Sequence, residues 1–217
     1  GCEVLPVKVL DAGGFGSYSS IAEGIRYAVD QGARVLNLSL AGNSPSSTLQ
    51  EAINYAWSNN VIVVAAAGNN GNSNPQYPAA CQHVVAVSAT EQDDTLAGFS
   101  STGNHLALAA PGNNIFTTSR DLANPYSAWR GTSFASPGVA AVAALVASAN
   151  PSLNNTQIVT VLEETSDDLG AVGPDASFGH GRVNAALAVS VASGLPIETN
   201  PPSAPAIPPT VNIANPV

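Results

Sequence analysis

Apolar runs and amphipathic stretches alternate along the first third of the chain. Residues 4–10 (VLPVKVL), 34–40 and 61–66 are continuous apolar runs rich in β-branched side chains, which is typical of buried strands. Between these runs, residues 19–31 and 47–59 repeat their apolar positions with helical spacing. This β-α-β-α-β order predicts a parallel sheet covered by helices, in which the functional loops follow the carboxyl ends of the strands.

The next part of the chain predicts shorter strands followed by two helices. Residues 84–118 contain short apolar runs broken by turn residues. Residues 132–148 are rich in alanine and predict a long helix that Asn150-Pro151 should end, and residues 154–164 predict another helix. We therefore expect an α/β fold with three layers, a parallel sheet between two layers of helices.

The last segment has a different composition. From about residue 195 the chain contains seven prolines and no helical period, which favours an extended linker or tail. We predict that residues 1–193 form the folded unit and that residues 194–217 form a Pro-rich tail or linker. This division gives the chain one domain with a sizeable core.

Charge and hydropathy exclude two classes of function. The formal net charge is -9, from six Lys+Arg against fifteen Asp+Glu, and an acidic surface repels the phosphate backbone of nucleic acids. The chain has no 18-residue apolar run, and the longest apolar stretch, residues 138–149, is interpreted as a buried helix. We therefore expect no nucleic-acid partner and no membrane partner. Two cysteines, Cys2 and Cys81, neither require nor exclude a disulfide.

One heptad carries the most chemical information. Residues 131–137 read Gly-Thr-Ser-Phe-Ala-Ser-Pro, so that Ser133 opens an apolar helix whose dipole favours a negative charge. A serine at such a place can also be a simple helix cap. The heptad resembles the G-T-S-x-A-x-P motif of the subtilisin-like (S8, subtilase) serine peptidases, and all five fixed positions occur here. The resemblance implies that Ser133 is a nucleophile.

Further segments follow the family pattern in order and extend the resemblance over about residues 4–193. The resemblance implies that residues 1–193 are the C-terminal part of a subtilisin-like catalytic domain. Residues 61–71 (VIVVAAAGNNG) match the strand and loop of the oxyanion-hole asparagine, which implies that role for Asn69. Residues 36–42 (LNLSLAG) match the strand edge that pairs with the substrate backbone. The other matching segments are Pro6 to Leu10, Tyr77 to Ala79, Phe99 to Ser101, Ala110 to Gly112 and Gly179 to Ala185.

The resemblance also implies a substrate site with two walls. One wall and the peptide-binding strand comprise Ser39, Leu40, Ala41 and Gly42. The other wall comprises Ala66, Ala67 and Gly68, and Thr132 beside the serine completes the candidate substrate-binding set. Because the side chains on both walls are small, we expect an open pocket that accepts a large apolar or aromatic residue of a polypeptide substrate.

The catalytic partners of the serine are missing from the sequence. The subtilase triad runs Asp, then His, then Ser along the chain, and neither the D-T/S-G motif nor the H-G-T motif of the first two occurs here. Asp11 is interpreted as a turn residue, and His83, His105 and His180 as surface or turn imidazoles. Without a general base the serine hydroxyl is a poor nucleophile, so we expect little or no peptidase activity from this chain alone.

Metal binding is not expected either. Calcium is common in the family, but its stronger site uses the absent N-terminal part, and the turn of a weaker site reads His105-Leu106-Ala107 here, without the acids. The acidic pairs Asp93-Asp94 and Asp167-Asp168 are interpreted as solvated turn residues. We therefore predict no metal and no cofactor.

Three functions are compatible with these motifs. The first is a part of a secreted subtilisin-like endopeptidase, the second a weak stand-alone serine esterase, and the third a non-catalytic pseudoprotease that binds peptides. The extracellular location rests on the resemblance. An incomplete N-terminus would leave apolar surface exposed, and we expect that surface to be covered by the missing N-terminal segment, by self-association through an exposed sheet edge, or by a rearranged fold.

Overall fold

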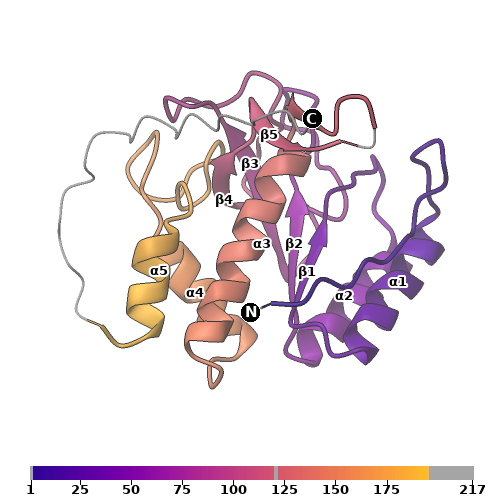
Figure 1. The fold of residues 1–217 in the computed structure, drawn as a ribbon, viewed down its shortest axis with the longest axis horizontal. Helices are drawn as coiled ribbons and strands as arrows, with labels where there is room; N and C mark the ends of the chain where they lie inside the picture. Colours follow the sequence, from indigo (N-terminus) through magenta and orange to yellow (C-terminus); the bar gives the residue numbers. More distant parts are fainter. Residues whose placement is uncertain (1, 120–121, 196–217) are drawn as a thin grey trace, which may run out of the picture.

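The sheet at the centre of the molecule is parallel throughout. The computed structural model describes residues 2–119 and 122–195. Four strands lie in the order β1 (Val35–Leu38), β2 (Ile62–Ala66), β3 (Val84–Thr90) and β4 (Leu106–Pro111), each parallel to its neighbour (Figure 1). All four carboxyl ends therefore point to one edge of the sheet, where the candidate motif residues follow.

Helices cover both faces of the sheet. On one face, α1 (Tyr18–Asp30) and α2 (Ser47–Ser58) bury Ile25 and Ile53 against one core cluster. On the other face, α3 (Thr132–Ala149), α4 (Asn155–Glu164) and α5 (Ala185–Ala192) build the second cluster. Side chains of β2 alternate between the two, because successive residues of a strand point to opposite faces. This arrangement confirms the predicted three-layer α/β fold.

The long helix α3 is apolar because it lies in the interior. By length and composition it is the one helix among residues 2–119 and 122–195 that could cross a membrane. Its buried residues, however, pack against the sheet and against α4 and α5, and Val139, Val142 and Val146 belong to the second core cluster. The apolar run is thus accounted for by burial within the domain, as the sequence predicts for residues 138–149.

The predicted strand at residues 4–10 is wrong. These residues are extended but pair with no strand, although Val7 and Val9 pack against the first core cluster. They lie across α1, since a Cβ added at Gly24 would come 2.4 Å from Cγ1 of Val9. A strand needs a neighbour for its backbone groups, and within the described part of the chain β1 is paired on one side only, with β2.

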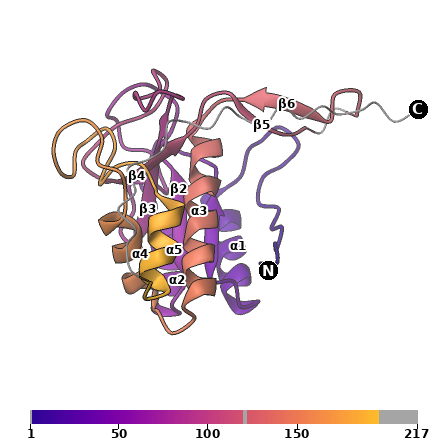
Figure 2. The same ribbon diagram turned by 60° about the vertical axis from the view of Figure 1, so that its left-hand side comes forward.

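The structure also contains a two-stranded hairpin, which the sequence did not predict. The strands β5 (Ile115–Thr118) and β6 (Tyr126–Trp129) pair in antiparallel fashion. Figure 2 shows the hairpin projecting from the end of the molecule to which the carboxyl ends of the sheet strands point. Its side chains are largely exposed, and Phe116 stacks on Tyr126 with 6.1 Å between ring centroids.

The two cysteines are both free thiols. Cys2 is exposed, whereas burial raises the pKa of the Cys81 thiol to about 11. The question that the sequence left open is therefore answered in favour of two unpaired cysteines. The predicted Pro-rich tail lies outside the described residues from residue 196 onward.

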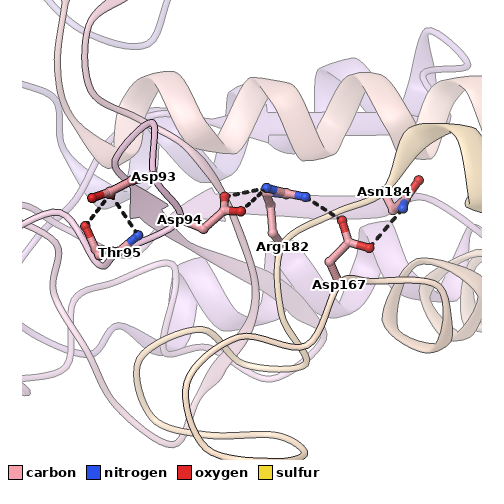
Figure 3. Close-up of polar contacts among 6 residues, drawn as sticks. All are labelled: Asp93, Asp94, Thr95, Asp167, Arg182 and Asn184. Carbon is pink, nitrogen blue, oxygen red and sulfur yellow. Dashed lines mark hydrogen bonds and ion pairs between the residues drawn. The ribbon is translucent and has the colours of Figure 1, made fainter. Parts of the chain in front are cut away.

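Arg182 ties three segments together beside β4 (Figure 3). Its backbone pairs with Ala109 of β4 and with Asp167, and its guanidinium contacts the carboxylates of Asp94 and Asp167, the latter at 2.6 Å. Asn184 donates a further hydrogen bond to Asp167 Oδ1 at 3.0 Å. The interpretation of Asp94 and Asp167 as merely solvated turn residues is therefore wrong.

Replacing Arg182 with alanine should destabilise the fold by about 2 kcal/mol, because two carboxylates would then share a partly buried site without a cation. Urea unfolding measures this loss. Arg26→Ala is the matched control, since Arg26 is exposed and lies over the Tyr55 ring, a contact worth below about 1 kcal/mol. Equal losses for the two variants would show that the Arg182 cluster contributes nothing beyond an ordinary surface cation.

Candidate active site

The candidate nucleophile sits in the first turn of the central helix. Gly131 precedes α3 with a φ of 143°, a backbone conformation that favours glycine, and the helix begins at Thr132. The N–H of Ser133 is therefore among the first four helical N–H groups, which have no partner within the helix. These groups and the helix dipole make the surroundings of Ser133 favourable for a negative charge. The Ser133 hydroxyl donates to the carbonyl oxygen of Ser39 at 3.3 Å.

Asn69 faces the same point from the loop after β2. Its Oδ1 accepts hydrogen bonds from the backbone N–H of Thr132 at 2.8 Å and from the Thr132 hydroxyl at 3.0 Å. The Thr132 side chain is fully buried and also accepts a bond from the Gly68 N–H at 3.1 Å. With Oδ1 held in this way, the Asn69 side chain presents its Nδ2 donor, which makes no hydrogen bond to any described residue.

A cavity of about 360 Å³ opens beside these two residues. Of the predicted set, it is lined by Ser39, Leu40, Ala41, Ala66, Gly68, Asn69, Thr132 and Ser133. Gly42 and Ala67 do not line it. Gly42 instead pairs its backbone with Tyr77, by two hydrogen bonds of 2.8 Å, and Ala67 is fully buried in the first core cluster.

Three lining residues were missed by sequence reasoning: Asn43, Asn70 and Gln76. Asn43 and Asn70 each directly follow a segment that the sequence predicts to belong to the site. Their place next to these segments is the signal that could have identified them. Gln76 follows neither wall, and no local pattern marks it. It reaches the cavity because the next residue, Tyr77, is paired with Gly42.

A chain of hydrogen bonds holds the start of α3 against β1. Ser136 donates to Oδ1 of Asn37 at 2.7 Å, and Nδ2 of Asn37 donates to the Ser39 hydroxyl at 2.9 Å. The Ser39 hydroxyl in turn donates to the carbonyl oxygen of Ser133 at 2.8 Å. Ser133 and Ser39 are thereby fixed relative to each other. Asn37 and Ser136 are further residues that the sequence did not single out.

Comparison with known proteins agrees with this geometry. The sequence profile described as the subtilase family (Peptidase_S8) matches residues 1–181. This chain belongs to the subtilase family. Among its relatives, thermitase of Thermoactinomyces vulgaris is 45% identical over 86% of this chain and 64% of its own length. Subtilisin Savinase of Lederbergia lenta is likewise 45% identical, over 86% of this chain and 67% of its own length.

Solved structures of proteases share the fold of this subtilase chain. The crystal structure of a lanthipeptide protease matches with a TM-score of 0.80 and 27% identity, over 86% of this chain and 69% of that chain. A protease from Pseudoalteromonas arctica PAMC 21717 matches with a TM-score of 0.76 and 35% identity, over 82% of this chain and 60% of that chain. The chain thus spans about two thirds or less of the length of these proteins.

None of the three histidines lies at the subtilase serine. His83 stacks on Trp57 with 5.0 Å between ring centroids, and His180 lies 3.9 Å from Glu163. His105 is half-buried, its Nε2 has no hydrogen-bond partner, and burial lowers its pKa. Among the residues that the structure describes, the cavity beside Ser133 is lined by no histidine and no carboxylate.

The other members of the two acidic pairs, Asp93 and Asp168, accept hydrogen bonds within their own loops. Asp93 accepts hydrogen bonds from the hydroxyl and the N–H of Thr95, which lower its pKa, and Asp168 accepts one from the Gly173 N–H at 2.9 Å. Within residues 2–119 and 122–195, no group of three or more His, Cys, Asp or Glu side chains could hold a metal ion. The absence of a calcium site stays a prediction.

Proposed function

We propose that this chain is the serine-bearing part of a secreted serine endopeptidase, with Ser133 as the nucleophile and with Asn69 Nδ2 and the Ser133 N–H as the oxyanion hole. The observation that supports this most directly is the orientation of Asn69. Two bonds from Thr132 hold its Oδ1, so that its amide N–H donor is free at the N-terminus of α3. A pre-oriented donor at that place stabilises negative charge without reorganisation.

The reaction follows from these positions. Ser133 Oγ forms a bond to the carbonyl carbon of the scissile peptide, and the carbonyl oxygen takes up the negative charge between Asn69 Nδ2 and the helix N-terminus. The substrate is a polypeptide that lies along Ser39 to Gly42 as an added antiparallel strand. Collapse of the intermediate breaks the C–N bond, and the leaving amine takes the proton that the Ser133 hydroxyl gave to the base. An acyl group remains on Ser133, which water then hydrolyses.

The proton of the Ser133 hydroxyl needs a base that these residues do not supply. The hydroxyl donates to a backbone carbonyl of Ser39, which cannot take up the proton. We propose that the Asp and the His come from the N-terminal segment of the same protein, which binds along the unpaired edge of β1. Ser39 directly follows that strand, so a segment at this edge lies close to the nucleophile. The alternative is that a second copy of the chain binds at the same edge of β1, so that two copies associate.

The complete oxyanion hole favours a second, weaker activity. A hydroxyl without a base still attacks activated esters slowly when the oxyanion is stabilised, and triad-deficient enzymes retain about 10³- to 10⁴-fold acceleration over water, a figure obtained with subtilisin. The chain alone is therefore expected to cleave activated esters slowly and to leave peptides intact. A pseudoprotease that only binds peptides would cleave neither activated esters nor peptides.

The test uses a fluorophosphonate probe and a p-nitrophenyl ester, with Ser133→Ala as the control. We expect slow ester turnover by the chain alone that disappears in the control, and a rise of at least about 10³-fold when the part of thermitase that this chain does not span is added. Turnover equal to that of Ser133→Ala under both conditions would contradict the proposal and favour a peptide-binding role. Peptide hydrolysis by the chain alone would contradict the proposal that the base comes from outside this chain.

A further inference from the structure

The floor of the cavity is a buried amide. Gln76 lines the cavity beside Ser133 and Asn69, yet its side chain belongs to neither wall and is only 6% exposed. The open pocket between two walls of small side chains stays a prediction. Gln76 adds a longer side chain to the lining, from a third segment of the chain.

Both walls hold Gln76 in place. The backbone of the next residue, Tyr77, makes two hydrogen bonds of 2.8 Å with Gly42, at the end of the peptide-binding wall. On the other wall, a Cβ added at Gly68 would lie 2.7 Å from Cγ of Gln76 and 3.0 Å from Oγ of Ser101. The aliphatic part of the glutamine thus occupies the space that glycine leaves free at this position.

The amide at the end of this side chain is poorly satisfied. Its Nε2 donates to the carbonyl oxygen of Pro75 over 3.4 Å, which is long for a hydrogen bond. Its Oε1 has no partner among residues 2–119 and 122–195. Because the amide faces the cavity, water can meet its open groups while the cavity is empty, and a ligand that displaces this water must replace the hydrogen bonds. One N–H of the amide and its oxygen are therefore open to a ligand.

The rest of the cavity lining carries no charge. Its residues are serine, threonine, asparagine, leucine, alanine, glycine and Gln76. A charged substrate side chain would lose its hydration there without gaining an ion pair. An aromatic side chain would press against the amide and bury it without a partner, whereas a neutral side chain with its own amide can satisfy both open groups.

We infer that Gln76 determines the specificity of this pocket, so that the substrate residue on the acyl side of the scissile bond carries a primary amide, with glutamine preferred over apolar residues of the same length. The inference rests on the proposed function only in placing that residue in this cavity. It requires no catalytic turnover, since a cleaved product can occupy the cavity. The new carboxylate of such a product lies at Asn69 and the N-terminus of α3, where a negative charge is stabilised.

The experiment measures binding of fluorescent acyl-tripeptides that end in Gln, Met or Phe with a free carboxylate, by fluorescence anisotropy on the full chain. Gln and Met have nearly equal length, so their comparison isolates the amide. We expect about tenfold tighter binding of the Gln peptide than of the Met peptide by the unmodified chain. In Gln76→Leu the order should reverse, and Gln76→Ala should bind the Phe peptide about tenfold more tightly than the unmodified chain does.

Gln92→Ala is the matched control, because Gln92 is an exposed amide outside the cavity, and it should keep the preference for the Gln peptide. Equal binding of the three peptides by the unmodified chain, or tighter binding of Phe, would overturn the inference while leaving the proposed function intact. Failure of all three peptides to bind would overturn the substrate groove itself and the inference with it. The peptide series on the unmodified chain decides the matter even if a Gln76 variant does not fold.

Discussion

Asn69→Ala should lose about 10²- to 10³-fold in kcat on every substrate that the protein hydrolyses, a range known for single oxyanion donors and established in part on subtilisin itself. The donor is oriented before substrate arrives, by the two bonds from Thr132 to Asn69 Oδ1. Its contact with the substrate oxygen strengthens as that oxygen becomes negative. The loss should therefore appear in kcat, with KM little changed. Steady-state kinetics with an activated ester measure both.

Two further variants separate orientation from donation. Thr132→Val removes the hydroxyl that fixes Asn69 but keeps the Thr132 N–H, so we expect an intermediate loss of about tenfold. Asn74→Ala is the control, because Asn74 is an exposed asparagine of the same loop that does not line the cavity, and it should leave kcat within about twofold. A loss confined to KM in Asn69→Ala would mean that the amide binds substrate uniformly and is no oxyanion donor.

The proposed nucleophile and the proposed oxyanion donor could be located in the sequence because each lies in a short contiguous motif. Ser133 opens a helix and Asn69 lies in the loop after a buried strand, so local pattern places both at the functional edge of a parallel sheet, while their proposed roles rest on the resemblance to the subtilase motifs. The same rule anticipated Ser39 to Ala41 after β1. These residues converge because the sheet is parallel, and its apolar strands made the sheet predictable.

Gln76 and Arg182 could not be predicted in this way. Gln76 enters the cavity through the pairing of Tyr77 with Gly42, and Arg182 meets Asp94 and Asp167 through the crossing of three loops. Such contacts depend on tertiary positions that no local period encodes. Residues 4–10 show the converse: their β-branched composition is that of a strand, but strand formation also needs a neighbouring strand, which a propensity cannot supply.

The loop around Arg182 also depends on a close approach of two backbones. Gly181 has a φ of 123°, and a Cβ there would lie 2.2 Å from the carbonyl oxygen of Asp167 and 2.7 Å from its carbonyl carbon. Two neighbouring hydrogen bonds hold both segments in place. The Ala109 N–H donates to the Gly181 oxygen at 2.8 Å, and the Arg182 N–H donates to the Asp167 oxygen at 2.9 Å. Neither backbone can therefore move away without breaking a hydrogen bond to a sheet strand or within the loop.

Gly181→Ala should therefore destabilise the protein by about 3 kcal/mol or more, the sum of backbone strain and steric overlap with a backbone that is itself hydrogen-bonded. Gly173→Ala is the matched control in the same loop, because Gly173 has a φ of 82° but no atom within 4 Å of an added Cβ. It should cost only about 1 kcal/mol, from strain alone. Urea unfolding of the two variants separates the contributions: equal losses would mean that the crossing relaxes freely, and the close contact between residues 167 and 181 would then not hold the C-terminal loop on β4.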